Sequence, residues 1–134
     1  MDPFSLSSKV RALLGVAIGS VWVFHGLYSK ILGGIPRHQA IVSRVLGEEW
    51  GPVATIGIGL LEIALGLWAY IGWSRRCCAA VQTLAIIAMN SIEIARANDL
   101  LISAPGMVLL NSLFLLVVWV WALAKPKDVS SHRR

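Results

Sequence analysis

The apolar segment GPVATIGIGLLEIALGLWAYIGW, residues 51–73, decides the fold of this chain. Its length suits a helix that crosses a bilayer, because about 20 residues at 1.5 Å each span the roughly 30 Å hydrocarbon core. Glu62 is its one charged residue and falls near its centre. A carboxyl group is costly to place there unless it faces a protein interior or a wet cavity. The segment therefore predicts a membrane-spanning helix and, at Glu62, a candidate functional group.

Three further apolar segments of helical length lie before and after this one, at about residues 12–28, 77–95 and 104–124. The 134-residue chain is 57% hydrophobic and 14% charged, which is more apolar surface than a soluble domain of this size can bury. Each segment is long and uninterrupted, whereas membrane strands are short and alternate in polarity. We expect one all-α membrane domain, residues 1–134, built as a bundle of four transmembrane helices.

The connection between the first two segments predicts a short amphipathic helix at the membrane interface, residues 36–47. Pro36 begins it, at a helix position where proline is tolerated. Ile41 and Val45 share one side of this helix, and charged side chains occupy much of the rest. The polar C-terminal tail, residues 125–134, is expected to be disordered.

The basic residues lie in the gaps between the apolar segments. The net charge is +5, but no single basic patch forms, so we expect no nucleic-acid partner. With the N-terminus inside, eight Lys and Arg residues fall on the cytoplasmic side and four on the outer side. The sequence therefore predicts a multi-pass protein of the cell inner membrane, with both termini in the cytoplasm.

Polar residues of all four segments fall at a similar depth, in the outer half of the membrane. Residues spaced by three or four also share helix faces, and small residues beside them let membrane helices approach closely. We expect a polar pocket that opens outward. Its candidate ligand-binding residues are Trp22, His25, Lys30, Arg37, His38, Glu62, Asn90, Glu93, Arg96 and Asn111.

Each candidate also has a structural interpretation. A protonated Glu62 can hydrogen-bond a neighbouring helix, Glu93 and Arg96 can form an interfacial ion pair, and Asn90 and Asn111 can join helices. The basic residues of the short helix can contact lipid headgroups. A histidine with two carboxylates resembles a metal site, but no short-range ligand motif supports one, so no metal is predicted. No catalytic residue can be assigned.

Two stretches resemble the DoxX-like family of small four-helix membrane proteins. VWVFHGLYSKILGGIPRHQAIVSRVLG, residues 21–47, holds a Gly-x-x-x-Lys ending at Lys30 and a Pro-Arg-His sequence, and IGIGLLEIALGLW, residues 56–68, holds Gly-x-x-Glu-x-x-x-Gly around Glu62. The resemblance covers about residues 11–126. It implies a membrane fold and an association with redox systems, because the family takes its name from a subunit of a thiosulfate:quinone oxidoreductase. Relatives have also been linked to receptor assembly.

Three functions fit these observations. The first is a membrane protein whose pocket binds a small lipophilic or quinone-like ligand, as an accessory component of a membrane redox system. A quinone is then a possible cofactor, and no other cofactor is evident. The second is a membrane-embedded isomerase or oxidoreductase that uses Glu62, Glu93 and His25. The third is an assembly partner or chaperone for another membrane protein. Beyond the lipid bilayer, a membrane protein partner or a second copy of the chain is a possible partner.

Overall fold

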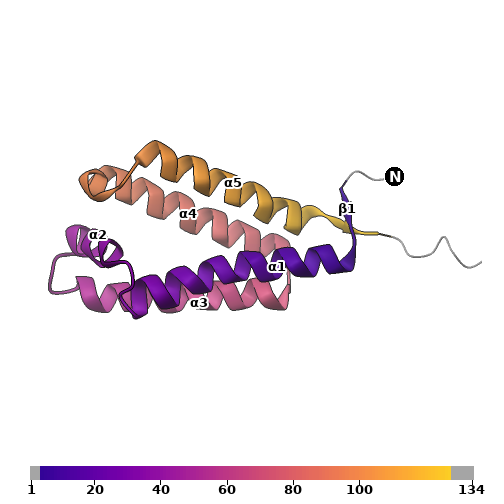
Figure 1. Ribbon diagram of the computed structural model, residues 1–134, viewed down its shortest axis with the longest axis horizontal. Helices are drawn as coiled ribbons and strands as arrows, with labels where there is room; N and C mark the ends of the chain where they lie inside the picture. The colour runs from indigo at the N-terminus through magenta and orange to yellow at the C-terminus, as the bar shows by residue number, and fades with distance from the viewer. Residues whose placement is uncertain (1–3, 128–134) are drawn as a thin grey trace, which may run out of the picture.

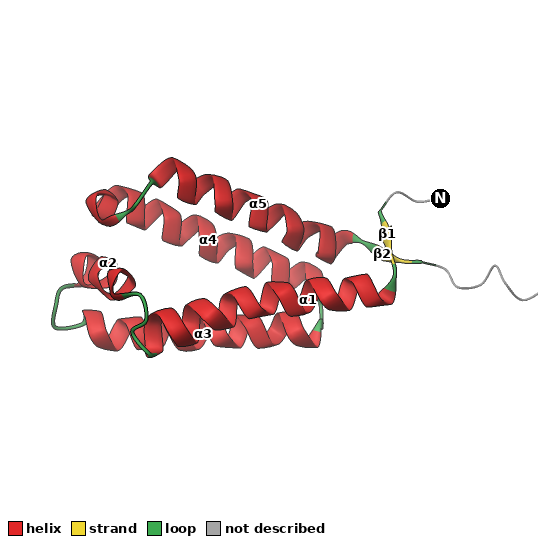
Figure 2. Cartoon of the chain, in the orientation of Figure 1, coloured by secondary structure: helices red, strands yellow, loops and turns green. Residues whose placement is uncertain are grey.

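The computed structural model describes residues 4–127 of the chain, and most of them are helical (Figure 2). In chain order the elements are β1 (Ser5–Leu6), α1 (Ser8–Val23), the π-helix η1 (Phe24–Ile31), α2 (Pro36–Leu46), α3 (Gly51–Ile71), α4 (Arg75–Ala97), the 3-10 helix η2 (Asn98–Leu100), α5 (Ala104–Leu123) and β2 (Lys125–Pro126).

Four helical stretches in the described residues are long and apolar enough to cross a membrane, which confirms the predicted four-span architecture. The second and fourth, Gly51–Ile71 and Ala104–Leu123, end close to where we predicted. The first and third, Ser8–Ile31 and Arg75–Leu100, are several residues longer than the apolar segments that indicated them. Their extra turns carry polar residues that a count of apolar residues leaves out.

The four long helices form two packed pairs (Figure 1). α1 and η1 lie along α3, and α4 lies along α5. α3 and α4 are joined by a short turn, yet they contact each other much less than either contacts its own partner. The two pairs approach each other at the end that holds the chain termini and separate toward the other end, where α2 lies.

Glycines allow α1 and η1 to lie directly against α3. A Cβ atom added to Gly66 would be 2.7 Å from the carbonyl oxygen of Gly19, and one added to Gly59 would be 2.8 Å from that of Gly26. These distances are too short for any side chain unless the backbone moves. Glu62 lies between the two glycines of α3 on the same buried face, so the close packing sets its position against the first helix.

Short polar and proline signals set the helix ends. The side-chain oxygens of Ser7 and Ser103 accept hydrogen bonds from backbone N–H groups in the first turns of α1 and α5. Pro52 and Pro105 stand at the start of α3 and α5, where a missing N–H costs nothing. Gly72 ends α3 with a φ of 73°, a left-handed conformation that favours glycine.

Apolar side chains fill much of the interior between the two helix pairs. This core consists of Ile18, Trp22, Leu65, Ala69, Cys78, Ala79, Ile86, Val118, Trp121 and Ala122. Gln82 is buried among them and accepts a hydrogen bond from the indole N–H of Trp22 at 2.7 Å. Toward α2 the pairs diverge, and the packed core gives way to a cavity.

The first long helix is not α-helical throughout, which corrects our expectation of an uninterrupted segment. From Phe24 to Ile31 it is a π-helix, and the pattern continues past its end, where the N–H of Leu32 donates to the carbonyl of Leu27 at 2.8 Å. Helices of this kind are rare and occur mostly as single-turn insertions in α-helices, frequently at functional sites. The apolar pattern of the sequence does not indicate this π-helix, because the spacing of apolar and polar residues there is close to that of an α-helix.

α2 follows the π-helix after a short loop and lies across the open end of the bundle. Its position at a membrane interface remains a prediction. At the opposite end β1 and β2 pair in parallel, with Ser5 beside Lys125. The predicted polar tail, residues 125–134, begins with this strand, and its remainder, residues 128–134, lies outside the described residues.

Candidate functional site

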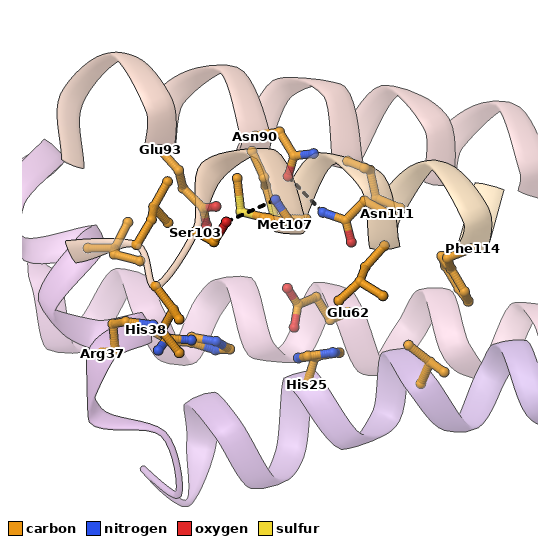
Figure 3. Close-up of a pocket in the computed structure, with 18 of the residues that line it drawn as sticks. His25, Arg37, His38, Glu62, Asn90, Glu93, Ser103, Met107, Asn111 and Phe114 are labelled. Carbon is orange, nitrogen blue, oxygen red and sulfur yellow. Dashed lines mark hydrogen bonds between the residues drawn. The ribbon is translucent and has the colours of Figure 1, made fainter. Parts of the chain in front are cut away.

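A cavity of about 580 Å³ lies between the two helix pairs at the α2 end (Figure 3). That size is within the usual range for small-molecule sites. It is lined by residues from every long helix, from α2 and from the loop before α5: Val21, Trp22, His25, Lys30, Arg37, His38, Ile41, Glu62, Ile86, Met89, Asn90, Glu93, Leu101, Ile102, Ser103, Gly106, Met107, Leu110, Asn111 and Phe114.

An ion pair joins the first helix to α3 at the wall of the cavity. The ammonium of Lys30 donates to both carboxylate oxygens of Glu62, at 2.8 and 3.0 Å. The Glu62 side chain is 6% exposed and the Lys30 side chain 10%. Removing one partner of such a buried pair costs far more than replacing both, because the remaining charge loses its compensation. The predicted candidate Glu62 therefore has a fixed, charged neighbour.

The π-helix explains how Lys30 and His25 reach the same cavity. The two residues are five apart, so an α-helix would turn them about 140° away from each other. Hydrogen bonding from i to i+5 places residues five apart about one turn above each other instead. Both side chains therefore line the cavity, and the Lys30 side chain meets Glu62 of α3 there.

Two histidines from different elements stack beside this wall. The rings of His25 and His38 are 5.9 Å apart between centroids, with 24° between their planes. The Nδ1 atom of His38 is buried and has no hydrogen-bond partner among the described residues. Burial, followed by the charges of Lys30, His25 and Arg37, lowers the pKa of His38 to about 4. His38 is therefore neutral at physiological pH.

The opposite wall is formed by α4 and α5 and is also polar. The side-chain amide of Asn111 donates to the carbonyl oxygen of Asn90 at 2.9 Å, which joins the two helices as the sequence suggested. The Asn111 carbonyl oxygen remains available as an acceptor. Glu93 lies one turn beyond Asn90 toward α2 and is half-buried.

The end of the cavity nearest the core is apolar. The rings of Trp22 and Phe114 meet edge to face there, with centroids 6.3 Å apart. Ile86, Met89 and Met107 complete this end. The cavity thus has an apolar end beside the core and a polar end beneath α2, an arrangement that suits an amphiphilic molecule.

The structure brings nine of the ten predicted residues to this one cavity, and Arg96 is the exception. Arg96 is exposed and does not line the cavity. A spacing of three residues turns the helix face by about 60° at each step, so Arg96 lies about 120° away from Asn90. The suggested ion pair between Glu93 and Arg96 is also not formed within the described part of the chain.

Sequence reasoning missed several residues of the cavity. Met89, Met107 and Phe114 line its apolar end, but apolar residues in apolar segments carry no signal of their own. Gln82 supports the site by orienting Trp22, and its polarity within an apolar helix was the signal that could have found it. Arg44 pairs with Asp99 at 2.8 Å, and its contact with lipid headgroups remains a prediction.

A second, more polar hollow of about 790 Å³ lies on the other side of α2. It is bordered by parts of η1, α2 and the start of α3. Lys30 lines both hollows and so stands in the wall between them. In the described residues no group of three or more His, Cys, Asp or Glu side chains is placed to hold a metal ion.

The model of the DoxX-like family matches residues 19–119, which include both walls of the cavity and α2. Comparisons with curated proteins and with solved structures each found no match. The family match covers well over half of the 134 residues and agrees with the four membrane-spanning helices. This chain is therefore an integral membrane protein that belongs to the DoxX-like family.

Proposed function

We propose that this protein binds a small lipophilic molecule with a polar head in the cavity beneath α2. The observation that carries the proposal is the cavity itself, which has an apolar end at Trp22 and Phe114 and a polar end at Lys30, Glu62 and Glu93. Some of the polar residues contact each other directly, Lys30 with Glu62 and Asn111 with Asn90, as a structural role requires. Arg37 and Glu93 have no ion-pair partner in residues 4–127, and the polar groups together line about 580 Å³ of space.

A quinone-like molecule belongs to this class of ligand, and it would make the bound ligand redox-active. Its ring would lie among the aromatic and methionine side chains, and its carbonyl oxygens would accept hydrogen bonds at the polar end. An accessory role in a membrane redox system is the part of the proposal that rests on the family resemblance alone.

The test is a titration of the purified protein with a short-chain benzoquinone and with a fatty alcohol of equal chain length. We expect saturable binding of at least one ligand. Glu62→Gln should weaken binding of the fatty alcohol at least about tenfold, because the alcohol hydroxyl donates to the Glu62 carboxylate and a hydrogen bond to a charged group contributes about 1.5–3 kcal/mol. Arg96→Gln is the matched control, since Arg96 lies outside the cavity. Absence of saturable binding, with identical behaviour of both variants, would refute the proposal.

A membrane-embedded isomerase or oxidoreductase is the second candidate. The observation in its favour is that two carboxyl groups share one cavity in different surroundings, with Glu62 paired to Lys30 and Glu93 without an ion pair among the described residues. Carboxyl groups in unlike surroundings can divide acid and base roles. Conversion of a bound lipophile by the wild type but not by Glu93→Gln would support this candidate.

We further propose that both termini lie in the cytoplasm and that the cavity faces the outer side of the cell membrane. The termini and the cavity lie at opposite ends of the bundle. If the termini lie in the cytoplasm, the cavity therefore faces the outer side. The excess of Lys and Arg on the terminal side supports the cytoplasmic location of that side.

A further inference from the structure

An arginine and a glutamate line the cavity without an ion-pair partner in residues 4–127. Arg37 on α2 and Glu93 on α4 both line it toward the α2 end. Neither residue has an ion-pair partner within 4.0 Å in residues 4–127. Lys30 and Glu62, by contrast, neutralise each other directly.

Half-buried charges next to apolar surface are costly when they lack partners. Arg37 presents a guanidinium, which binds phosphate or carboxylate groups through two parallel hydrogen bonds. Glu93 presents a carboxyl group, which pairs with an ammonium. A ligand head that carries an anionic and a cationic group side by side would satisfy both residues at once.

Two uncharged polar groups also line the cavity. The side-chain oxygen of Ser103 accepts from the N–H of Gly106, so its own hydroxyl proton remains to be donated. The carbonyl oxygen of Asn111 remains free to accept. These groups suit the hydroxyl and ester oxygens of a glycerol backbone next to a charged head.

The exposed lining residues show where the cavity opens. Val21, Ile102 and Leu110 line it and are 39%, 85% and 68% exposed, whereas most of the other lining side chains are half-buried or buried. They belong to α1, to the loop before α5 and to α5. The mouth therefore runs along the side of the bundle between α1 and α5, and its edges are apolar, as an opening toward lipid acyl chains requires.

We propose, on the basis of the ligand-binding function above, that the ligand is a single-chain zwitterionic phospholipid with an amine head. Its phosphate lies at Arg37, its amine at Glu93, and its chain passes the apolar end and leaves through the lateral mouth. The cavity is then entered from the bilayer and not from water.

The experiment compares three ligands with the same acyl chain: lysophosphatidylethanolamine, lysophosphatidic acid and monoacylglycerol. Retention on the full-length protein in detergent is measured by native mass spectrometry. We expect lysophosphatidylethanolamine to bind at least about tenfold more tightly than the other two, because each matched charge contributes a charge-assisted hydrogen bond. Free phosphoethanolamine, which lacks the chain, is expected not to displace it.

Two variants that each remove one charge assign the two charges. Arg37→Gln should weaken both phosphate ligands, whereas Glu93→Gln should weaken only lysophosphatidylethanolamine and bring it to the level of lysophosphatidic acid. Arg96→Gln, one turn beyond Glu93 and outside the cavity, should change nothing. Thermal unfolding of each variant confirms that a loss of binding is not a loss of folding.

The outcomes also separate this inference from the proposed function. Equal binding of the three ligands that is lost in a cavity-filling Met107→Trp variant would overturn the zwitterionic head and keep the ligand site. Tighter binding of a neutral quinone than of any phospholipid would also overturn the zwitterionic head and keep the ligand site. Equal retention by the wild type and Met107→Trp would overturn both proposals.

Discussion

At the scale of single residues, the Lys30–Glu62 ion pair makes a clear energetic prediction. Lys30→Met should lower the free energy of unfolding by about 3 kcal/mol, because it leaves a buried carboxylate without its partner. Glu62→Leu should lower the free energy of unfolding less, because Lys30 also lines the second, more polar hollow and can turn its ammonium toward water. The double variant should be more stable than Lys30→Met alone. The measurement is thermal unfolding in detergent, and a double variant that loses the sum of the two single effects would contradict the pairing.

His38 makes a prediction about pH. Its pKa is about 4 in the folded protein and about 6.5 when unfolded, so between these values the unfolded chain binds more protons. The His38 contribution to stability is therefore complete above pH 6.5 and is lost as the pH falls from 6.5 toward 4. Titration of the ring by NMR checks the folded value directly. A His38 midpoint near 6.5 in the folded protein would show that the site is wetter than the structure indicates.

At the scale of elements, the contact between α1 and α3 depends on missing side chains. Gly66→Ala should destabilise the protein by about 1–3 kcal/mol, because the new Cβ atom meets the backbone of Gly19. Gly57→Ala on the same helix is the matched control. A Cβ atom there has no neighbour within 4 Å, so the change should be neutral or stabilise the helix by up to about 1 kcal/mol. Equal effects of both substitutions in thermal unfolding would contradict this packing.

The elements also show how far the sequence alone can lead. Segment length and apolarity predicted the four long helices, and the position of Pro36 predicted where α2 begins. The π-helix could not be predicted, because the free energy that compensates its unfavourable hydrogen-bond pattern comes from packing against α3 and not from local sequence propensity. The same holds for the site. The position of Glu62 and Glu93 along their helices predicted that both line one cavity, and both do. Arg96 does not line it, because its position around the helix axis turns it away.

At the scale of the whole molecule, the orientation in the membrane can be tested by labelling. In a chain with both cysteines replaced, Glu48→Cys introduces a thiol at an exposed position near α2, and Ser74→Cys introduces one at an exposed position near the termini. An impermeant maleimide added to intact cells should label only the first. Labelling of only the second would show that the protein is inserted the other way round.

The central claim is that the cavity between the helix pairs holds a small molecule in the native membrane. The most direct measurement is native mass spectrometry of protein extracted gently from its own membrane. We compare the wild type with Met107→Trp, which fills the cavity, and with Val108→Trp, which changes an exposed neighbour on the same helix. We expect a bound small molecule in the wild type and in Val108→Trp that Met107→Trp lacks. A bare chain in all three samples, or the same bound molecule in all three, would contradict it.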